Sequence, residues 1–140
     1  EESAFDPAAE SPAQAYGLMQ LIVPTARAYA APLGLGSSPA ALRVPATNIA
    51  LGSRVLGDLT RRFTNNPLLA IPAYNAGPGR PRKWAAARPL ADFDTWVELI
   101  PFRETRRYTK RVLASRAAYA TLYHPTEAEE VLALPLTLGY

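Results

Sequence analysis

The chain has 140 residues, which is long enough for one domain with a hydrophobic core, and 49% of them are hydrophobic. It has no cysteine, which excludes disulfides and cysteine-based sites, and no run of about 18 to 20 apolar residues that could span a membrane. The formal net charge is +3, but residues 80–116 hold ten Lys and Arg against four Asp and Glu. This local excess of six suits either an acidic partner or a solvated surface.

Helices are favoured over strands along the whole chain. Alanine is abundant, and extended runs of Val, Ile and Thr with period-two alternation are missing. The fourteen prolines predict that the helices are short and sharply bounded. We therefore predict an all-α fold of roughly seven to nine short helices, with no room for a parallel sheet.

The first forty residues predict one clear helix between loops. We expect residues 1–4 to be the last turn of a helix that begins upstream of this sequence, because Pro7 disfavours its continuation. Residues 8–15 form a predicted loop. A helix should run from Val23 to about Ala31, since a proline in its first turn removes no hydrogen bond that the turn would have made. A short capped turn is expected over residues 37–42.

The strongest helical pattern runs from Pro45 to about Phe63. Its apolar residues recur at i, i+3, i+7, i+10 and i+14, and this spacing predicts one buried face. The face consists of Ile49, Gly52, Leu56, Leu59 and Phe63.

Short helices and one long helix are predicted for the second half of the chain. After the stop at Asn65-Asn66-Pro67, a short helix should end at Ala76-Gly77, and helical turns are expected over residues 81–87 and 92–99. The last strong helix should run from Phe102 to Tyr123, with residues 124–140 as a tail. Its predicted inner face consists of Thr105, Tyr108, Val112, Ser115, Tyr119 and Leu122.

The residues give no support for a metal site, a nucleotide-binding site or a Ser-His-Asp catalytic triad. The one histidine, His124, stands beside a proline with no acidic pair at ligand spacing, which favours a surface or capping role. A Ser-His-Asp arrangement would depend on the same histidine, and no glycine-rich phosphate loop follows a strand. We therefore expect neither a metal site nor a cofactor.

Three other blocks each have an ordinary structural explanation when taken singly. Glu2 is a charge at a chain end, where solvated side chains are usual. Tyr74 and Asn75 precede a glycine, as residues at a helix terminus often do. Glu104 in the first turn of a helix is favourable to the helix dipole.

Together and in this order, the blocks resemble the catalytic domain of the soluble lytic murein transglycosylases, which have a goose-type lysozyme-like fold. The resemblance covers about residues 1–123 of a domain that we expect to comprise residues 1–140. It depends on Glu2-Ser3, Ser11, Gly17-Leu18-Met19-Gln20 and Pro24-Thr25-Ala26, on the unbroken "AYNAGPGR" of residues 73–80, and on Ile100-Pro101-Phe102, Glu104-Thr105-Arg106 and Tyr108. Gln14, Tyr16 and Pro72 depart from the family pattern.

The resemblance implies cleavage of the β-1,4 bond between N-acetylmuramic acid and N-acetylglucosamine in peptidoglycan. The reaction uses no water and leaves a 1,6-anhydromuramoyl end. Glu2 would protonate the glycosidic oxygen as general acid and then accept the proton of the muramoyl O6 hydroxyl as general base. Because Glu2 would serve in both steps, the reaction needs no second carboxylate at the distance from the first that ordinary retaining and inverting glycosidases require. A free glutamate has a pKa of about 4.3, so an apolar wall, for which Met19 is a candidate, must raise it.

The same resemblance assigns the remaining positions to substrate binding. The implied binding residues are Ser11, Met19, Gln20, Tyr74, Asn75, Glu104 and Tyr108. The expected partner is the peptidoglycan strand, whose peptide carboxylates give the basic segment a role. We expect the protein in the bacterial envelope, in the periplasm, with further domains upstream of residue 1.

Two other functions remain open at this point. The first keeps the fold but uses water to cleave the same bond, as goose-type lysozymes do. The second is a non-catalytic module that binds peptidoglycan or a protein and serves as a scaffold. Binding to nucleic acid would depend on the basic segment alone, so we expect no nucleic-acid partner.

Overall fold

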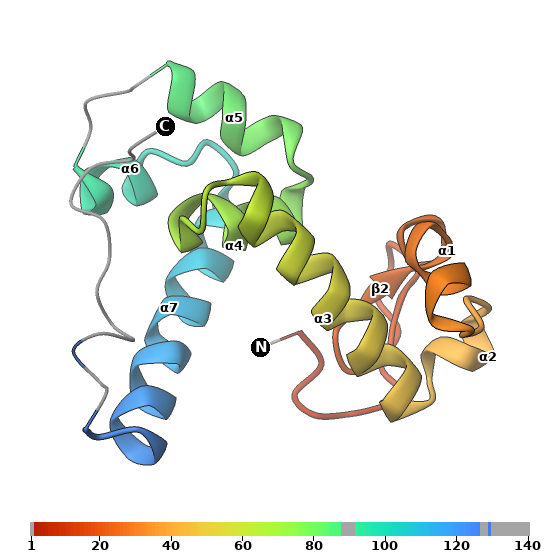
Figure 1. Ribbon diagram of the computed structural model, residues 1–140. Helices are drawn as coiled ribbons and strands as arrows, with labels where there is room; N and C mark the ends of the chain where they lie inside the picture. Colours follow the sequence, from red (N-terminus) through yellow and green to blue (C-terminus); the bar gives the residue numbers. More distant parts are fainter. Residues whose placement is uncertain (1, 88–91, 127–128, 130–140) are drawn as a thin grey trace. The chain divides into compact units, whose positions relative to one another are not determined.

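The computed structural model describes residues 2–87, 92–126 and 129 (Figure 1). These residues are mostly helical, which confirms the predicted all-α class, and they also contain one small two-stranded sheet. The chain forms two compact units, residues 1–58 and residues 59–140. Of the predicted tail over residues 124–140, only residues 124–126 and 129 belong to the described part.

The first unit begins with a turn instead of the helical turn expected over residues 1–4. The amide of Asp6 donates to the carbonyl of Ser3 at 3.0 Å. Ala4 and Phe5 have φ values of +52° and +66°, in the left-handed region that a right-handed helix does not use. For the described residues 2–4 the predicted helical turn is therefore wrong.

A short hairpin follows the N-terminal loop. Strand β1 (Ala15–Tyr16) pairs antiparallel with β2 (Leu21–Ile22), so that Tyr16 lies opposite Leu21. The four residues 17–20 connect the two strands. Strands of two residues are too short to leave an alternating pattern, so the sequence does not predict this sheet.

Three of the predicted helical segments follow the hairpin. Helix α1 (Val23–Ala30) continues into the 3₁₀ turn η1 (Ala31–Leu33), and α2 (Pro39–Leu42) begins where the Ser38 side chain accepts a hydrogen bond from the Ala41 amide at 3.2 Å. Helix α3 (Pro45–Arg62) runs from the first unit into the beginning of the second. The predicted bounds are confirmed to within about a residue because proline occupies the first turn of each helix.

The predicted buried face of α3 is partly wrong. Ile49 is 47% exposed and Leu56 is 37% exposed, although both belong to the apolar repeat. The buried residues are Asn48, Leu51, Gly52, Val55 and Leu59. The helix is thus rotated by about one residue from the predicted orientation, and this rotation places the polar side chain of Asn48 in the interior.

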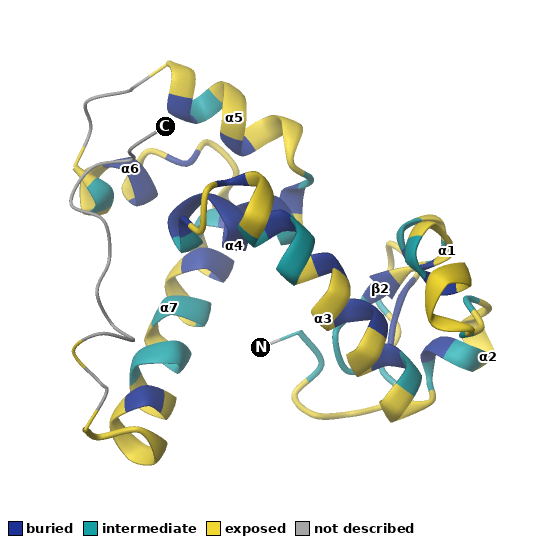
Figure 2. Ribbon diagram, in the orientation of Figure 1, coloured by how far each residue is buried: buried dark blue, intermediate teal, exposed yellow. Residues whose placement is uncertain are grey.

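The second unit is built around α4 (Pro67–Ala76), a helix buried on most sides (Figure 2). The side chain of Asn66 caps it by accepting a hydrogen bond from the Leu68 amide at 3.0 Å. Helix α4 continues through Pro72 without ending, and it packs against α5 (Gly79–Ala86) and α7 (Arg103–Tyr123). Helix α6 (Phe93–Glu98) packs on α7.

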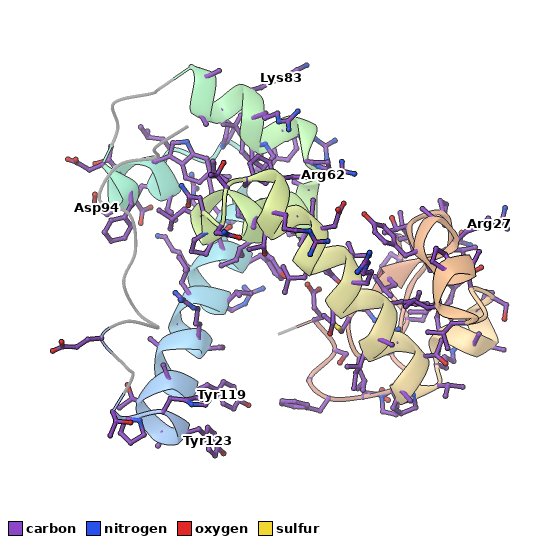
Figure 3. All side chains as sticks on the ribbon, in the orientation of Figure 1. Arg27, Arg62, Lys83, Asp94, Tyr119 and Tyr123 are labelled. Carbon is purple, nitrogen blue, oxygen red and sulfur yellow. The ribbon has the colours of Figure 1, made fainter. Side chains whose placement is uncertain are left out.

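The predicted inner face of α7 is confirmed only in the first half of the helix. Thr105 and Tyr108 are buried, whereas Tyr119 is 52% exposed and Leu122 is 71% exposed. The ring of Tyr119 stacks on that of Tyr123 instead, with 5.7 Å between their centroids (Figure 3). No helix within the described residues is both long and apolar enough to cross a membrane.

Candidate active site

Glu2 lies at the beginning of the described chain, and its surroundings are well defined. The residue is half-buried, and its carboxylate oxygen Oε1 is buried. The hydroxyl of the adjacent Ser3 donates to the carbonyl of Leu18 at 3.0 Å. This bond joins the segment that carries Glu2 to the connection between β1 and β2, which includes Met19 and Gln20. Glu2 is thus not the freely solvated chain end that its position in the sequence would suggest.

Asn48 on α3 holds this connection in place. The side chain is fully buried and makes three hydrogen bonds. Its Oδ1 accepts from the Met19 amide at 2.7 Å, and its Nδ2 donates to the carbonyls of Tyr16 at 2.8 Å and Leu42 at 2.7 Å. One amide side chain therefore joins β1, the β1–β2 connection, the end of α2 and α3. Three backbone groups, two of them in buried hydrogen bonds, thus have the Asn48 side chain as their partner.

Two glycines allow the close packing around Asn48 and Met19. Gly17 has φ +73°, and a Cβ at this position would overlap the Leu42 carbonyl and lie 2.6 Å from Asn48 Nδ2. A Cβ on Gly52 of α3 would overlap the Met19 sulfur and lie 2.8 Å from the Met19 Cβ. Met19 therefore rests directly on the backbone of α3, which fixes the side chain predicted to form the apolar wall.

Ser11 and Gln20 are partly engaged in fixing their own loops. Ser11 Oγ accepts a hydrogen bond from the Ala15 amide at 3.1 Å, which leaves the hydroxyl proton able to donate elsewhere. Gln20 Nε2 donates to the carbonyls of Ala9 at 3.2 Å and Gly17 at 2.9 Å. These two bonds fix the orientation of the Gln20 side-chain amide, and they therefore also fix the direction in which its oxygen Oε1 points.

The backbone of this unit is strained next to these side chains. Besides Ala4 and Phe5, the residues Gln14 and Gln20 have left-handed φ values of +57° and +47°. Such conformations cost about 1–2 kcal/mol for residues with a side chain, and they concentrate at functional sites. The positive φ explains why glycine would suit position 14, where this sequence has Gln.

The second unit carries the other predicted site residues on α4 and α7. Tyr74 and Asn75 lie in the last turn of α4; Tyr74 is half-buried and Asn75 is exposed. The hydroxyl of Thr105 on α7 donates to Asn75 Oδ1 at 2.7 Å. This bond ties the end of α4 to the first turn of α7, which also carries the exposed Glu104.

Tyr108 follows one turn after Glu104 and is 8% exposed. Most of its ring therefore contributes to the core of the second unit, and only a small part is accessible to a ligand. Next to it, Thr109 Oγ1 donates to the Thr105 carbonyl at 2.8 Å.

The structure thus brings the predicted site residues together in two groups. Glu2, Ser11, Met19 and Gln20 surround the hairpin of the first unit, and Tyr74, Asn75, Glu104 and Tyr108 lie where α4 and α7 meet in the second. Asn48 and Thr105 are supporting residues for which the sequence predicted no role in the site. A polar residue inside an apolar helix pattern was the one signal for Asn48.

Within the described residues, no group of three or more His, Asp or Glu could hold a metal ion.

Comparisons with known proteins agree on one family. Residues 1–97 match the family model of the transglycosylase SLT domain. The chain is 44% identical over 124 residues to the soluble lytic murein transglycosylase of Escherichia coli K12, covering 85% of this chain and 19% of that protein. It is 34% identical over 115 residues to the membrane-bound lytic murein transglycosylase D of the same organism, covering 81% of this chain and 25% of that protein.

Solved structures give the same result. The crystal structure of the 70 kDa soluble lytic transglycosylase SLT70 from Escherichia coli superposes with a TM-score of 0.84 at 39% identity, covering 94% of this chain and 22% of that chain. A complex of the 70 kDa enzyme with bulgecin A gives a TM-score of 0.78 at 43% identity, covering 84% and 20%. The chain thus spans about a fifth to a quarter of the length of these relatives.

Proposed function

Because the chain belongs to the transglycosylase SLT domain family and has its lysozyme-like fold, we propose that it cleaves peptidoglycan as a lytic transglycosylase. The bond broken is the β-1,4 bond between N-acetylmuramic acid and N-acetylglucosamine, and the product carries a 1,6-anhydromuramoyl end. We propose that residues 1–140 act as one catalytic domain in this reaction. The observation that carries the proposal is the half-buried Glu2, with its buried oxygen, in a segment bonded to the loop of Met19 and Gln20.

Glu2 is the proposed acid and base. In the first step its carboxyl proton passes to the glycosidic oxygen, the bond from that oxygen to the muramoyl C1 breaks, and positive charge develops on the sugar ring. In the second step the muramoyl O6 hydroxyl attacks C1 and gives its proton to the Glu2 carboxylate. The acid is thereby regenerated and no water is consumed. Because the nucleophile belongs to the substrate, its effective concentration at C1 is high.

The acid role requires a protonated carboxyl near neutral pH. The ordinary pKa of a glutamate is about 4.3, and removal of a carboxyl from water favours its neutral form. Burial of Oε1 supplies such surroundings, and we propose Met19, which packs on the α3 backbone, as the apolar wall. These features support Glu2 as the residue whose proton is transferred.

The other predicted residues have proposed roles in holding the sugars. The Ser11 hydroxyl and the Gln20 amide oxygen are suited to hydrogen bonds with N-acetyl or hydroxyl groups, because bonds to the backbone already fix both side chains. Asn75, held by Thr105, and the exposed Glu104 are proposed to bind the glycan strand, together with Tyr74 in the same turn of α4 as Asn75. For the buried Tyr108 we propose a supporting role, in which it fixes the turn of α7 that carries Glu104.

The relatives support a location in the bacterial cell envelope, where murein is found, and we propose the periplasm as the compartment. The further domains that we expect upstream of residue 1 remain a prediction.

Product analysis tests the proposed chemistry. The intact protein is incubated with purified sacculi, and the released muropeptides are separated and weighed. We expect ends that are lighter by one water than reducing muramic acid. Reducing ends instead would indicate a hydrolase of the lysozyme type, and binding to sacculi without soluble products would indicate a scaffold module.

A further inference from the structure

Arg80 and Phe102 each occupy a helix position that does not suit them. Arg80 lies in the first turn of α5, where the positive end of the helix dipole is unfavourable to a cation. Phe102 is the N-cap of α7 and makes no capping hydrogen bond, although this position favours Ser, Thr, Asp or Asn. Its side chain is also 45% exposed, so burial in the core does not explain it. The two helices therefore give no reason of their own for either residue.

The two residues contact each other. The guanidinium carbon Cζ of Arg80 lies 4.9 Å from the centroid of the Phe102 ring. Trp84, one turn further along α5, meets the same ring edge to face, with 5.4 Å between the ring centroids and an interplanar angle of 74°. Both arrangements are favourable, because the face of an aromatic ring attracts a cation and the positive edge of another ring. Helix α5 thus holds the beginning of α7 through Phe102.

Arg80 also reaches back to the end of α4. Its Nη1 donates a hydrogen bond to the carbonyl of Ala76 at 2.8 Å. Ala76 is the last residue of α4, and the carbonyls at this end of a helix lack partners within the helix and carry partial negative charge. A cation is therefore favourable there. One guanidinium group joins the end of α4 to the beginning of α7.

The two segments that Arg80 joins carry residues proposed to bind the glycan strand. Asn75 directly precedes Ala76, and Glu104 follows Phe102 by two residues in the first turn of α7. The hydrogen bond from Thr105 to Asn75 joins the same two segments at a second point. Binding residues need neighbours that hold them close to the geometry in which they bind.

We propose that Arg80 is a positioning residue for the glycan-binding residues of the second unit. It fixes Asn75 relative to Glu104 before the strand binds, and it does not contact the strand. Such preorganisation raises affinity, because less conformational freedom is lost on binding. This inference rests on the proposed function and deepens it, since it gives Arg80 a role in substrate affinity and none in the chemical step.

Four variants of the intact protein test this role. Arg80→Gln removes the cation, Phe102→Leu removes the ring but leaves every charge in place, and a double variant combines the two. Arg80→Lys keeps a cation but lacks the planar group that serves the ring and the carbonyl together. The controls are Arg27→Gln, at an exposed arginine of α1, and Tyr123→Leu, at an exposed ring in the last turn of α7 (Figure 3).

The measurement is KM and kcat for the cleavage of soluble peptidoglycan strands, together with the melting temperature of each variant. We expect Arg80→Gln to raise KM about fivefold and Phe102→Leu about threefold, as for the loss of an exposed cation–aromatic contact. The double variant should raise KM by less than the product of these effects, because both residues act through one contact. Arg80→Lys should restore part of the affinity. For all four variants kcat should stay within about twofold of the unsubstituted protein, and the controls should change neither constant.

A lower kcat and a lower melting temperature with unchanged KM would show a purely structural role and overturn the proposal. A higher KM for Arg80→Gln that Phe102→Leu does not share would overturn it too, because Arg80 would then act on the strand through its charge. If the unsubstituted protein does not cleave the strands, the proposed function is refuted, and dissociation constants for the same strands then test Arg80. Constants that rise for both single variants would support the positioning role, and unchanged constants would contradict it.

Discussion

Replacement of Asn48 by alanine removes three hydrogen bonds from the interior of the first unit. The Met19 amide and the carbonyls of Tyr16 and Leu42 lose their partner at a position that is fully buried. Each bond contributes about 1 kcal/mol, and a buried group left without a partner costs up to about 3 kcal/mol. We therefore expect Asn48→Ala to lower the free energy of unfolding by about 3–5 kcal/mol. For a chain of this length the melting temperature should fall by roughly 10–15 °C.

The matched control is Ile49→Ala, at the next residue of the same helix. Ile49 is 47% exposed, so its loss should cost about 1 kcal/mol or less. Thermal melting followed by circular dichroism compares the two variants, and hydrogen exchange of the Met19 amide reports the broken bond directly. Activity on sacculi should also fall, because the loop of Met19 and Gln20 loses its anchor. If Asn48→Ala is no more destabilising than Ile49→Ala, the role assigned to Asn48 is refuted.

Three further substitutions probe the surroundings of the site. Gly52→Ala should destabilise the protein by about 1–3 kcal/mol, because the new methyl group displaces Met19; an unchanged melting temperature would contradict the packing. Gln14→Gly should instead raise stability by about 0.5–1 kcal/mol, since glycine adopts φ +57° without strain; a lower melting temperature would count against this. Thr105→Val should cost about 1 kcal/mol and slow the cleavage of sacculi several-fold, because Asn75 loses its donor; full activity would show that Asn75 needs no such support.

The positions of the helices could be predicted from local signals in the sequence. Pro24, Pro39, Pro45 and Pro67 each mark the first turn of a helix, and this preference depends only on the proline ring and its missing amide. The faces of the helices depend on tertiary packing and were predicted less well. Ile49 and Leu56 fit an apolar repeat, yet α3 is oriented so that Asn48 reaches the backbone of three other segments.

Prediction of the candidate site from the sequence was limited in the same way, because the site also depends on tertiary contacts. Glu2 taken alone looked like a solvated terminal charge, and its role was inferred from a resemblance across three blocks. Its partial burial depends on contacts such as that of Ser3 with Leu18, which is fifteen residues away. Asn48 and Thr105 support site residues about thirty residues distant in the sequence. A polar residue in an apolar helix pattern can mark a residue such as Asn48, but a single sequence contains no local signal for the distant residues that it contacts.

The proposed function depends above all on Glu2, and substitution of its carboxyl group tests that claim most directly. The measurement is the rate at which 1,6-anhydromuropeptides are released from sacculi by the intact protein, by Glu2→Gln and by the control Glu10→Gln. Glu10 is an exposed glutamate of the same unit whose ion pair with Arg43 contributes little to stability. We expect Glu2→Gln to reduce the rate by at least about a hundredfold, as for the loss of a general acid, with Glu10→Gln close to the unsubstituted protein. A rate for Glu2→Gln within about threefold of the unsubstituted protein, far less than the loss expected for a general acid, would contradict the account.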